Sequence, residues 1–369
     1  MPTREIAMNL EPLLSELESD SESVRIYAAE DLGDLNEGAA VVPLFERLER
    51  EPSRKVREAI FSALEKIDYP EVIERAAQLL GSEDAFLRNL SVLLLQSKGS
   101  SIVPALISRM RNGDEDLRKF ILDAVFTIPG EEANVIFELA MEDTDINVLI
   151  TAIDHIGSQH RRVFKGRVEE ILAAATNPML VTVALNALVS IGDGKSMEVI
   201  EGRYERLGTI PPHEVLFYLQ ALVRLGTRDS LPSFSRILRE CGDRNLEDFT
   251  CALDQFQGRH TGTEVPEDLL GLLENMLSIF EGVPDESENQ QAAYEICRLL
   301  GGFAWSVRLQ ERLLKAVGSQ QARIRKGAVE GLRRFNSSNV ERLIKETIQL
   351  QRESNPSNLC VLDEMNSSI

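Results

Sequence analysis

The sequence predicts an all-α fold, a right-handed solenoid of about ten antiparallel helix pairs. The first observation is a recurring block, in which an apolar residue, usually followed by Arg, precedes apolar residues four, eight and eleven positions later. Val24-Arg25 with Ala28, Leu32 and Leu35 is the first example. These offsets return to one side of a 3.6-residue helix. The second observation is the period of about 31 to 32 residues, which is typical of stacked repeats.

The first residue of each block, its anchor, can be followed through the chain. The ten anchors are Val24, Val56, Leu87, Leu117, Val148, Leu180, Glu214, Asn245, Glu288 and Ile324. Eight positions after them stand Leu32, Leu64, Leu95, Val125, Ile156, Leu188, Leu222, Leu253, Ile296 and Leu332. All ten are aliphatic in a chain that is 43% apolar, so chance does not explain the register. The anchors of units seven, eight and nine are polar, and those units rest on the later positions only.

The third observation is a second apolar stretch before the blocks. These stretches cover 41–48, 72–80, 102–110, 135–141, 168–172, 231–238, 269–277 and 307–314. Short segments such as Glu51-Pro52-Ser53 and Asn112-Gly113-Asp114 separate stretch from block, with the residues expected at a helix end, turn and N-cap. Each repeat is therefore predicted to be an antiparallel helix pair.

The unbroken register predicts one continuous solenoid over residues 1–350, with less regular units at about 140–290. Two polar insertions with Gly and Pro, 258–266 and 281–288, lengthen the eighth and ninth units. Residues 351–369 are predicted to form a flexible C-terminal tail, in which 359–365 is a candidate short docking element.

The blocks resemble a known family. Asp20-x-x-x-Val24-Arg25-x-x-Ala28-Ala29-x-x-Leu32-Gly33 and the run from Ala322 to Val329 resemble HEAT repeats, particularly the short bacterial kind found also in phycobilin lyases. This resemblance spans roughly residues 10 to 350. It implies a fold, but no single function, because such arrays serve as scaffolds, adaptors, lyases and DNA glycosylases.

The resemblance also implies a role for the arginine of the block. In HEAT arrays the turn Asp and the helix Arg are expected to pair between neighbouring units. Five residues of this chain are the candidates for such a structural ladder: Arg25, Arg57, Arg88, Arg118 and Arg325. In the central units Leu149 and Val181 take the place of the arginine, so the array is expected to be more adjustable there.

Composition and net charge limit the kinds of partner and the cellular compartment to be expected. A net charge of -20 disfavours general binding to nucleic acid or to anionic lipid. No apolar run approaches the ~20 residues of a membrane helix, and the first residues lack the apolar core of a signal peptide. The four cysteines show no C-x-x-C spacing. We expect a cytoplasmic protein without inserted helices, disulfides or metal.

The last repeats differ in charge. The segment 304–345 contains only three acidic residues, Glu311, Glu330 and Glu341. Its ten basic residues are Arg308, Arg312, Lys315, Arg323, Arg325, Lys326, Arg333, Arg334, Arg342 and Lys345. Two interpretations stay open. This end docks an acidic segment, or it contacts the acidic body of its own chain.

Nothing in the sequence predicts catalysis. The four histidines show no metal-ligand spacing, and His155, next to the core residue Ile156, is interpreted as a packing or interface residue. Gly192-Asp193-Gly194-Lys195-Ser196 lacks the first glycine of a phosphate loop and follows a helix, so it is interpreted as a turn between repeats. We expect no enzyme and no cofactor, with a phycobilin lyase acting on a bilin chromophore as the alternative.

The candidate binding residues lie on the second helices of the pairs. Offsets of two, six and nine from the anchor face away from the core, and in units three to six several are apolar. The candidates are Leu93, Phe126, Ile150 and Val189, with the polar residues Asp123, Asp154 and Asn186. The alternative is that neighbouring repeats cover these side chains. The sequence predicts a scaffold or adaptor that binds a partner protein or peptide of unknown identity along the concave face.

Overall fold

The structure is a computed structural model, and it describes residues 3–241, 246–282, 289–335 and 339–354. All regular elements among these residues are helical: 21 α-helices and five short 3-10 turns. The predicted all-α solenoid is confirmed. The anchors Asn245 and Glu288, and the candidate docking element 359–365, lie outside the described residues.

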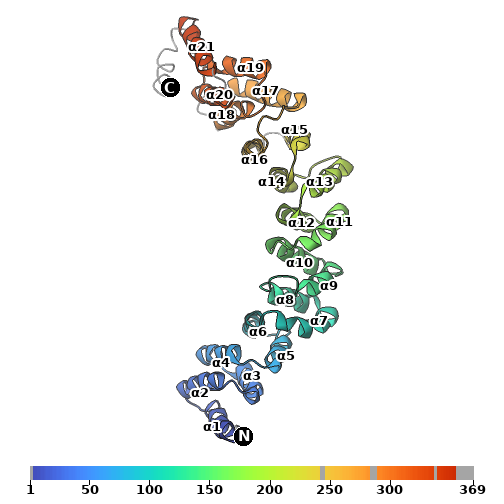
Figure 1. The fold of residues 1–369 in the computed structure, drawn as a ribbon, viewed down its shortest axis with the longest axis vertical. Coiled ribbons are helices and arrows are strands. Elements are labelled where there is room, and N and C mark those ends of the chain that lie inside the picture. Colours follow the sequence, from blue (N-terminus) through green and yellow to red (C-terminus); the bar gives the residue numbers. More distant parts are fainter. Residues whose placement is uncertain (1–2, 242–245, 283–288, 336–338, 355–369) are drawn as a thin grey trace. The chain divides into compact units, whose positions relative to one another are not determined.

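The chain divides into two compact units, residues 1–161 and 162–369. Unit 1 holds five helix pairs (Figure 1). Their helices are α1 (Thr3–Glu16), α2 (Glu22–Leu35), α3 (Val41–Arg50), α4 (Arg54–Lys66), α5 (Pro70–Leu79), α6 (Ala85–Ser97), α7 (Val103–Asn112), α8 (Glu115–Val125), α9 (Asn134–Met141) and α10 (Ile146–Ser158).

Unit 2 holds five further pairs and a last helix. Its helices are α11 (Lys165–Ala174), α12 (Pro178–Ile191), α13 (Gly194–Leu207), α14 (Val215–Leu225), α15 (Leu231–Cys241), α16 (Leu246–Arg259), α17 (Glu267–Glu281), α18 (Asn289–Leu300), α19 (Val307–Val317), α20 (Ala322–Arg334) and α21 (Val340–Ser354). The sequence pattern did not predict α13. Helix α21 includes residues 351–354, which were predicted to begin the tail.

The core of each unit lies between the two helices of a pair and between successive pairs. All ten residues eight positions after an anchor are buried, with exposed fractions of at most 1%. Burying one such side chain contributes about 1.5 to 3 kcal/mol. Within each unit the second helices pack on one another, as α2 does on α4 and α18 on α20. The core is therefore a repeating layer, as the periodicity predicts.

The turns form where the breaker residues predict them. Ser53, Asp84, Asp114 and Asn177 are N-caps whose side chains accept hydrogen bonds from backbone amides of the helices that follow. These bonds satisfy donors that a helix start leaves unpaired. The local sequence thus sets the start of these four second helices, and with it the register of their surface residues.

Candidate protein-interaction surface

The second helices of unit 1 carry most of the predicted binding residues, and Phe126 is the C-cap residue directly after α8. Helix α8 packs between α6 and α10, so residues at similar offsets from the anchor lie near one another on adjacent helices. We call the outward surface of these three helices the α6–α8–α10 face. Its members are Leu93, Gln96, Asp123, Phe126, Ile150, Asp154 and His155.

Five of the seven predicted residues lie on this face. Leu93 is the most exposed apolar member, with an exposed fraction of 52%. Asp154 is exposed, and Asp123, Phe126 and Ile150 are half-buried. Neighbouring repeats therefore cover these side chains only in part, which leaves a surface that is apolar and acidic together.

The other two predicted residues belong to unit 2. Asn186 is exposed and Val189 is half-buried, both on α12. Since α12 lies in the other compact unit, these residues form no part of the α6–α8–α10 face. For all seven residues, partner binding stays a prediction.

Phe126 and His155 form the centre of the face. Their ring centroids lie 4.6 Å apart with the planes tilted by 53°. His155 Nε2 lies 3.4 Å from Asp123 Oδ1, and Gln96 Nε2 donates to the Asp123 carbonyl oxygen at 2.8 Å. Three successive second helices are thus linked through one group of side chains. His155 packs at a contact between repeats, as its place beside Ile156 indicates.

Burial shifts the pKa of both Asp123 and His155 at this centre. Burial raises the pKa of Asp123, and the nearby His155 and Lys119 offset part of that rise. Burial lowers the pKa of His155, while Asp123, Asp154 and the Leu122 backbone act in the opposite direction. Near neutral pH the imidazole is therefore uncharged, and the face keeps the negative charges of Asp123 and Asp154.

The predicted ladder arginines share one geometry. Each donates to backbone carbonyl groups of the turn that precedes its own helix, five or six residues earlier. The acceptors are Ser19 and Asp20 for Arg25, Glu51 for Arg57, Ser82 and Glu83 for Arg88, Gly113 for Arg118, and Ser319 for Arg325. The arginine thus fixes the turn of its own repeat, a role that the resemblance did not imply.

Three of these arginines also form an ion pair with a carboxylate of the next repeat. Arg25 pairs with Glu51 at 2.9 Å, Arg57 with Asp84 at 3.3 Å and Arg118 with Asp143 at 2.6 Å. Arg88 instead lies over the ring of Phe120, 5.3 Å from its centroid. The partner is a turn Asp in only some repeats, because a turn Glu or an aromatic ring can occupy the same place.

Two buried arginines that sequence reasoning missed lie in or beside the repeats without a ladder residue. Arg161 donates to the carbonyl groups of Ile128 at 2.6 Å and Gly130 at 2.7 Å. Arg203 donates to those of Leu172 and Ala175 at 2.9 and 2.8 Å. Each reaches back about one repeat length instead of binding its own turn. An arginine at a fixed distance after the turn of the previous repeat is the signal that would have found them.

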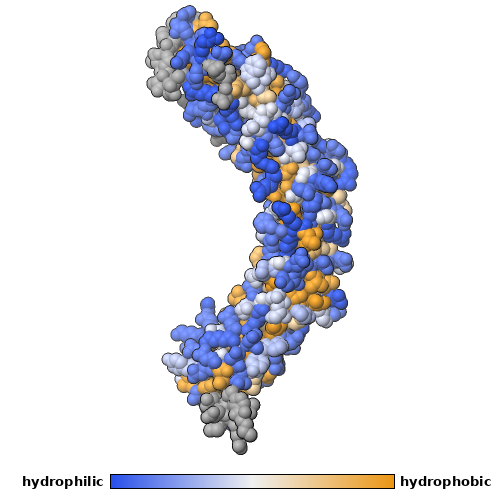
Figure 2. Space-filling model, in the orientation of Figure 1, coloured by the Kyte–Doolittle hydropathy of each residue, from blue (hydrophilic) through white to orange (hydrophobic). Residues whose placement is uncertain are grey.

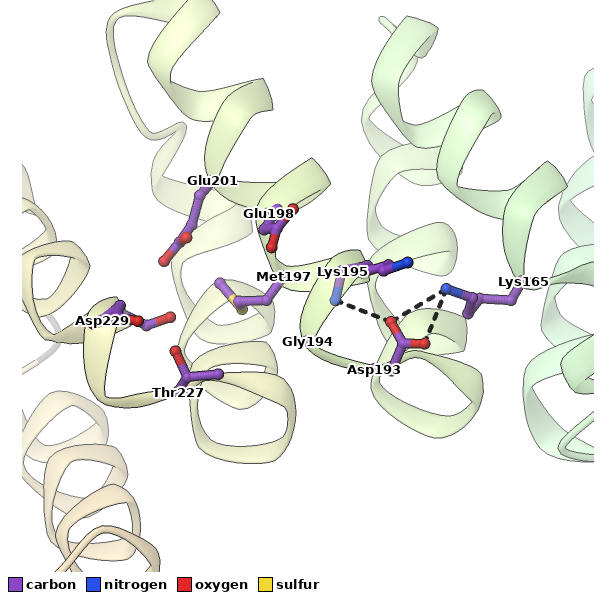
Figure 3. A pocket seen from close by; sticks show the side chains of 10 residues that line it. Lys165, Asp193, Gly194, Lys195, Met197, Glu198, Glu201, Thr227 and Asp229 are labelled. Atoms are coloured by element: carbon purple, nitrogen blue, oxygen red, sulfur yellow. Dashed lines mark hydrogen bonds and ion pairs between the residues drawn. The ribbon is translucent and has the colours of Figure 1, made fainter.

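The Gly-Lys-Ser segment lines an open depression of about 550 Å³ in unit 2 (Figure 3). Asp193 accepts hydrogen bonds from the amides of Lys195 and Ser196, and it also binds the Lys165 ammonium group. The amides that would cradle a phosphate are occupied by a carboxylate from the same chain. Only Gly192 and Asp193 form the predicted connection, and the interpretation of the remaining three residues as a turn is wrong, because α13 begins at Gly194.

The basic residues of the last repeats find acidic partners on earlier helices. The pairs are Arg308 with Glu267 and Glu274, Arg312 with Glu281, and Arg334 with Asp254. Arg333 binds Glu341. These contacts support the interpretation that this end contacts the acidic body of its own chain. Docking of an acidic segment stays a prediction.

The described residues contain no helix long and apolar enough to span a bilayer. Within the same residues, no group of three or more His, Cys, Asp and Glu side chains is placed to hold a metal ion. Most of the surface visible in Figure 2 is hydrophilic, and hydrophobic side chains show through in separate patches.

The stacked helix pairs define the class of protein, an α-solenoid of helical repeats. Residues 10–96 match the family model for HEAT repeats, which confirms the resemblance for this part of the chain. No curated protein matches the sequence.

Three solved structures are similar to this chain to different degrees. Kap121p bound to Ste12p is 13% identical with a TM-score of 0.53, covering 95% of this chain and 44% of that one. An engineered protein is 17% identical with a TM-score of 0.42, covering 89% and 99% of the two chains. The complex of CpcE and CpcF of phycocyanin lyase from Nostoc sp. PCC7120 is 19% identical with a TM-score of 0.28, covering 73% and 94%. Only the first of these similarities is high enough to bear on the fold, and none bears on function.

Proposed function

We propose that this chain is a non-catalytic interaction scaffold that binds a segment of a partner protein on the α6–α8–α10 face. The observation that carries the proposal is a combination of side chains on adjacent helices: an exposed Leu93 on α6, the Phe126–His155 ring pair and the carboxylate of Asp123. Apolar anchors next to fixed polar groups are typical of the cores of protein interfaces.

The rigid placement of these side chains also supports the proposal. The apolar binding residues are held by helices whose register is set by buried core residues and N-caps, so these side chains lose little freedom when a partner binds. The HEAT-repeat fold adds support, since Kap121p, a structural neighbour, is bound to another protein, Ste12p. A segment that covered Leu93, Phe126 and Ile150 would remove apolar surface from water along three successive repeats.

The test compares two surfaces of the same unit. The immobilised chain captures partners from native extract, and each captured protein is measured again with the double variant Phe126→Ala/Ile150→Ala. We expect at least about a tenfold loss of affinity, because truncating central anchors costs about 2 kcal/mol or more. The matched control is Tyr27→Ala, which removes an exposed aromatic ring from α2 and should leave binding unchanged. Equal binding by the double variant and the wild type would rule out this face.

A further inference from the structure

The carboxylate of Asp123 is a half-buried charge on the α6–α8–α10 face. Its one close polar neighbour among the described residues is the His155 imidazole, 3.4 Å from Oδ1. Lys119, on the same helix, binds Asp116 at 2.7 Å instead. Because a partly desolvated carboxylate retains free acceptor positions, a cation that donates hydrogen bonds would satisfy it.

The other charged groups near this carboxylate do not supply such a cation. Asp154 adds a second negative charge from α10, and Lys119 acts on Asp123 only at a distance. The His155 ring is uncharged near neutral pH, as burial lowers its pKa. The centre of the face therefore attracts positive charge from outside the chain.

The shape of the centre favours a flat cation over a compact one. The Phe126 ring and the Asp123 carboxylate both contact the His155 imidazole. A guanidinium group can stack on an aromatic face while its N–H groups bind both oxygens of a carboxylate. The chain uses the same stacking elsewhere, since Arg57 and Arg88 each lie 5.3 Å from a phenylalanine ring centroid. An ammonium group would gain the charge attraction but not the planar stacking.

The apolar members of the face indicate which kind of residue flanks the cation in the partner segment. Leu93 on α6 and Ile150 on α10 lie on the two helices that flank the Asp123–Phe126 pair. They can cover the aliphatic part of an arginine and the apolar residues next to it in an extended segment.

We propose that the partner segment presents an arginine flanked by apolar residues, and that its guanidinium group binds the Asp123 carboxylate and contacts the half-buried Phe126 ring. This inference rests on the proposed function and adds the chemistry of the partner to it. Specificity then comes from charge and planar shape, while the flanking apolar contacts supply affinity.

The experiment uses labelled synthetic peptides of the pattern Leu-X-Leu, with arginine, lysine or citrulline at X, and measures binding to the full chain by fluorescence polarisation. Citrulline keeps the planar shape of arginine without its charge. We expect the arginine peptide to bind about tenfold tighter than the citrulline peptide and more tightly than the lysine peptide. In Asp123→Asn the preference for arginine over citrulline should disappear. In Phe126→Leu the preference for arginine over lysine should shrink.

The outcomes separate the two proposals. Equal binding of arginine and citrulline peptides, or an unchanged preference in Asp123→Asn, overturns the arginine inference. So does the absence of arginine-peptide binding up to about 1 mM. If the three peptides bind equally but Phe126→Ala/Ile150→Ala abolishes binding, the scaffold proposal stands without the arginine. If peptides and captured partners bind the double variant as tightly as wild type, both proposals fail.

Discussion

Arg25 and Glu51 form a two-point ion pair that connects the first repeat to the second. Arg25 Nε and Nη2 donate to the two carboxylate oxygens of Glu51 at 2.9 and 3.0 Å, and Nη1 holds the carbonyl groups of Ser19 and Asp20. The side chains are almost fully buried, with exposed fractions of 8% and 0%. One arginine thus fixes the turn before α2 against the turn between α3 and α4.

The first prediction concerns the strength of this connection. Replacing Arg25 by Met leaves the Glu51 carboxylate buried with less compensation, although Arg47 still binds it at 2.6 Å. We expect the free energy of unfolding of the N-terminal repeats to fall by about 3 kcal/mol, as when one partner of a buried ion pair is removed. Urea denaturation followed by circular dichroism measures the change.

Arg54→Ala is the control for this prediction. Arg54 also pairs with a glutamate, Glu58 at 2.8 Å, but both side chains are exposed. Removing an exposed pair should change stability by no more than about 0.5 kcal/mol. Equal losses in the two variants would contradict the role assigned to Arg25.

The second prediction is a pH dependence. Burial acts to raise the pKa of Glu51, but hydrogen bonds from Arg25, the Ser53 amide and Arg47 outweigh it and lower the pKa below its ordinary value of 4.5. A carboxyl group with a lowered folded pKa contributes stability above pH 4.5, and this stability is lost as the pH falls through the folded pKa. We expect the wild type to lose stability more steeply below pH 4.5 than Glu51→Gln. Chemical denaturation at a series of acidic pH values gives both slopes, and parallel slopes would refute the assignment.

The third prediction tests the close approach of α18 and α20. A Cβ atom on Gly327 would lie 2.4 Å from the Tyr294 carbonyl oxygen, and one on Gly331 would lie 2.4 Å from that of Cys297. Since backbone atoms cannot move aside, Gly327→Ala should destabilise unit 2 by about 1 to 3 kcal/mol. Gly202→Ala, in α13 with open space around it, should instead stabilise by about 0.4 to 1 kcal/mol. Thermal melting of both variants decides between these signs, and a stabilised Gly327→Ala would refute the packing argument.

The sequence predicted the periodic part of this fold because one buried offset, from Leu32 to Leu332, recurs in every repeat. It did not predict α13, since the helix begins within the Gly-Lys-Ser segment that was interpreted as a turn. The anchor Glu214 looked like a weak point because it is polar. The structure buries it to an exposed fraction of 3%, with its Oε1 atom 3.7 Å from Arg203 Nη2 on the unpredicted helix.

The candidate surface was predictable in position but not in charge balance. The offsets placed Leu93 and Phe126 on the outward side of their helices, because offset alone fixes direction on a helix. Charge balance depends on which side chains of other repeats come near. Arg308 finds Glu267 and Glu274, 41 and 34 residues earlier, and no local count of charges reveals such partners.

The last prediction uses the pH response of the α6–α8–α10 face. Burial lowers the pKa of His155 below its ordinary 6.5 and raises that of Asp123 above 3.8. As the pH falls, the imidazole gains a positive charge while the carboxylate begins to lose its negative one, and both changes weaken attraction for an arginine. We expect the affinity for the arginine peptide to fall severalfold from about pH 7 to about pH 5, with a smaller fall in His155→Gln, which has no imidazole to gain a positive charge. The citrulline peptide should show little change over this range, because it carries no charge to be repelled. An arginine affinity that stays constant or rises on acidification would mean that the guanidinium group does not bind beside His155.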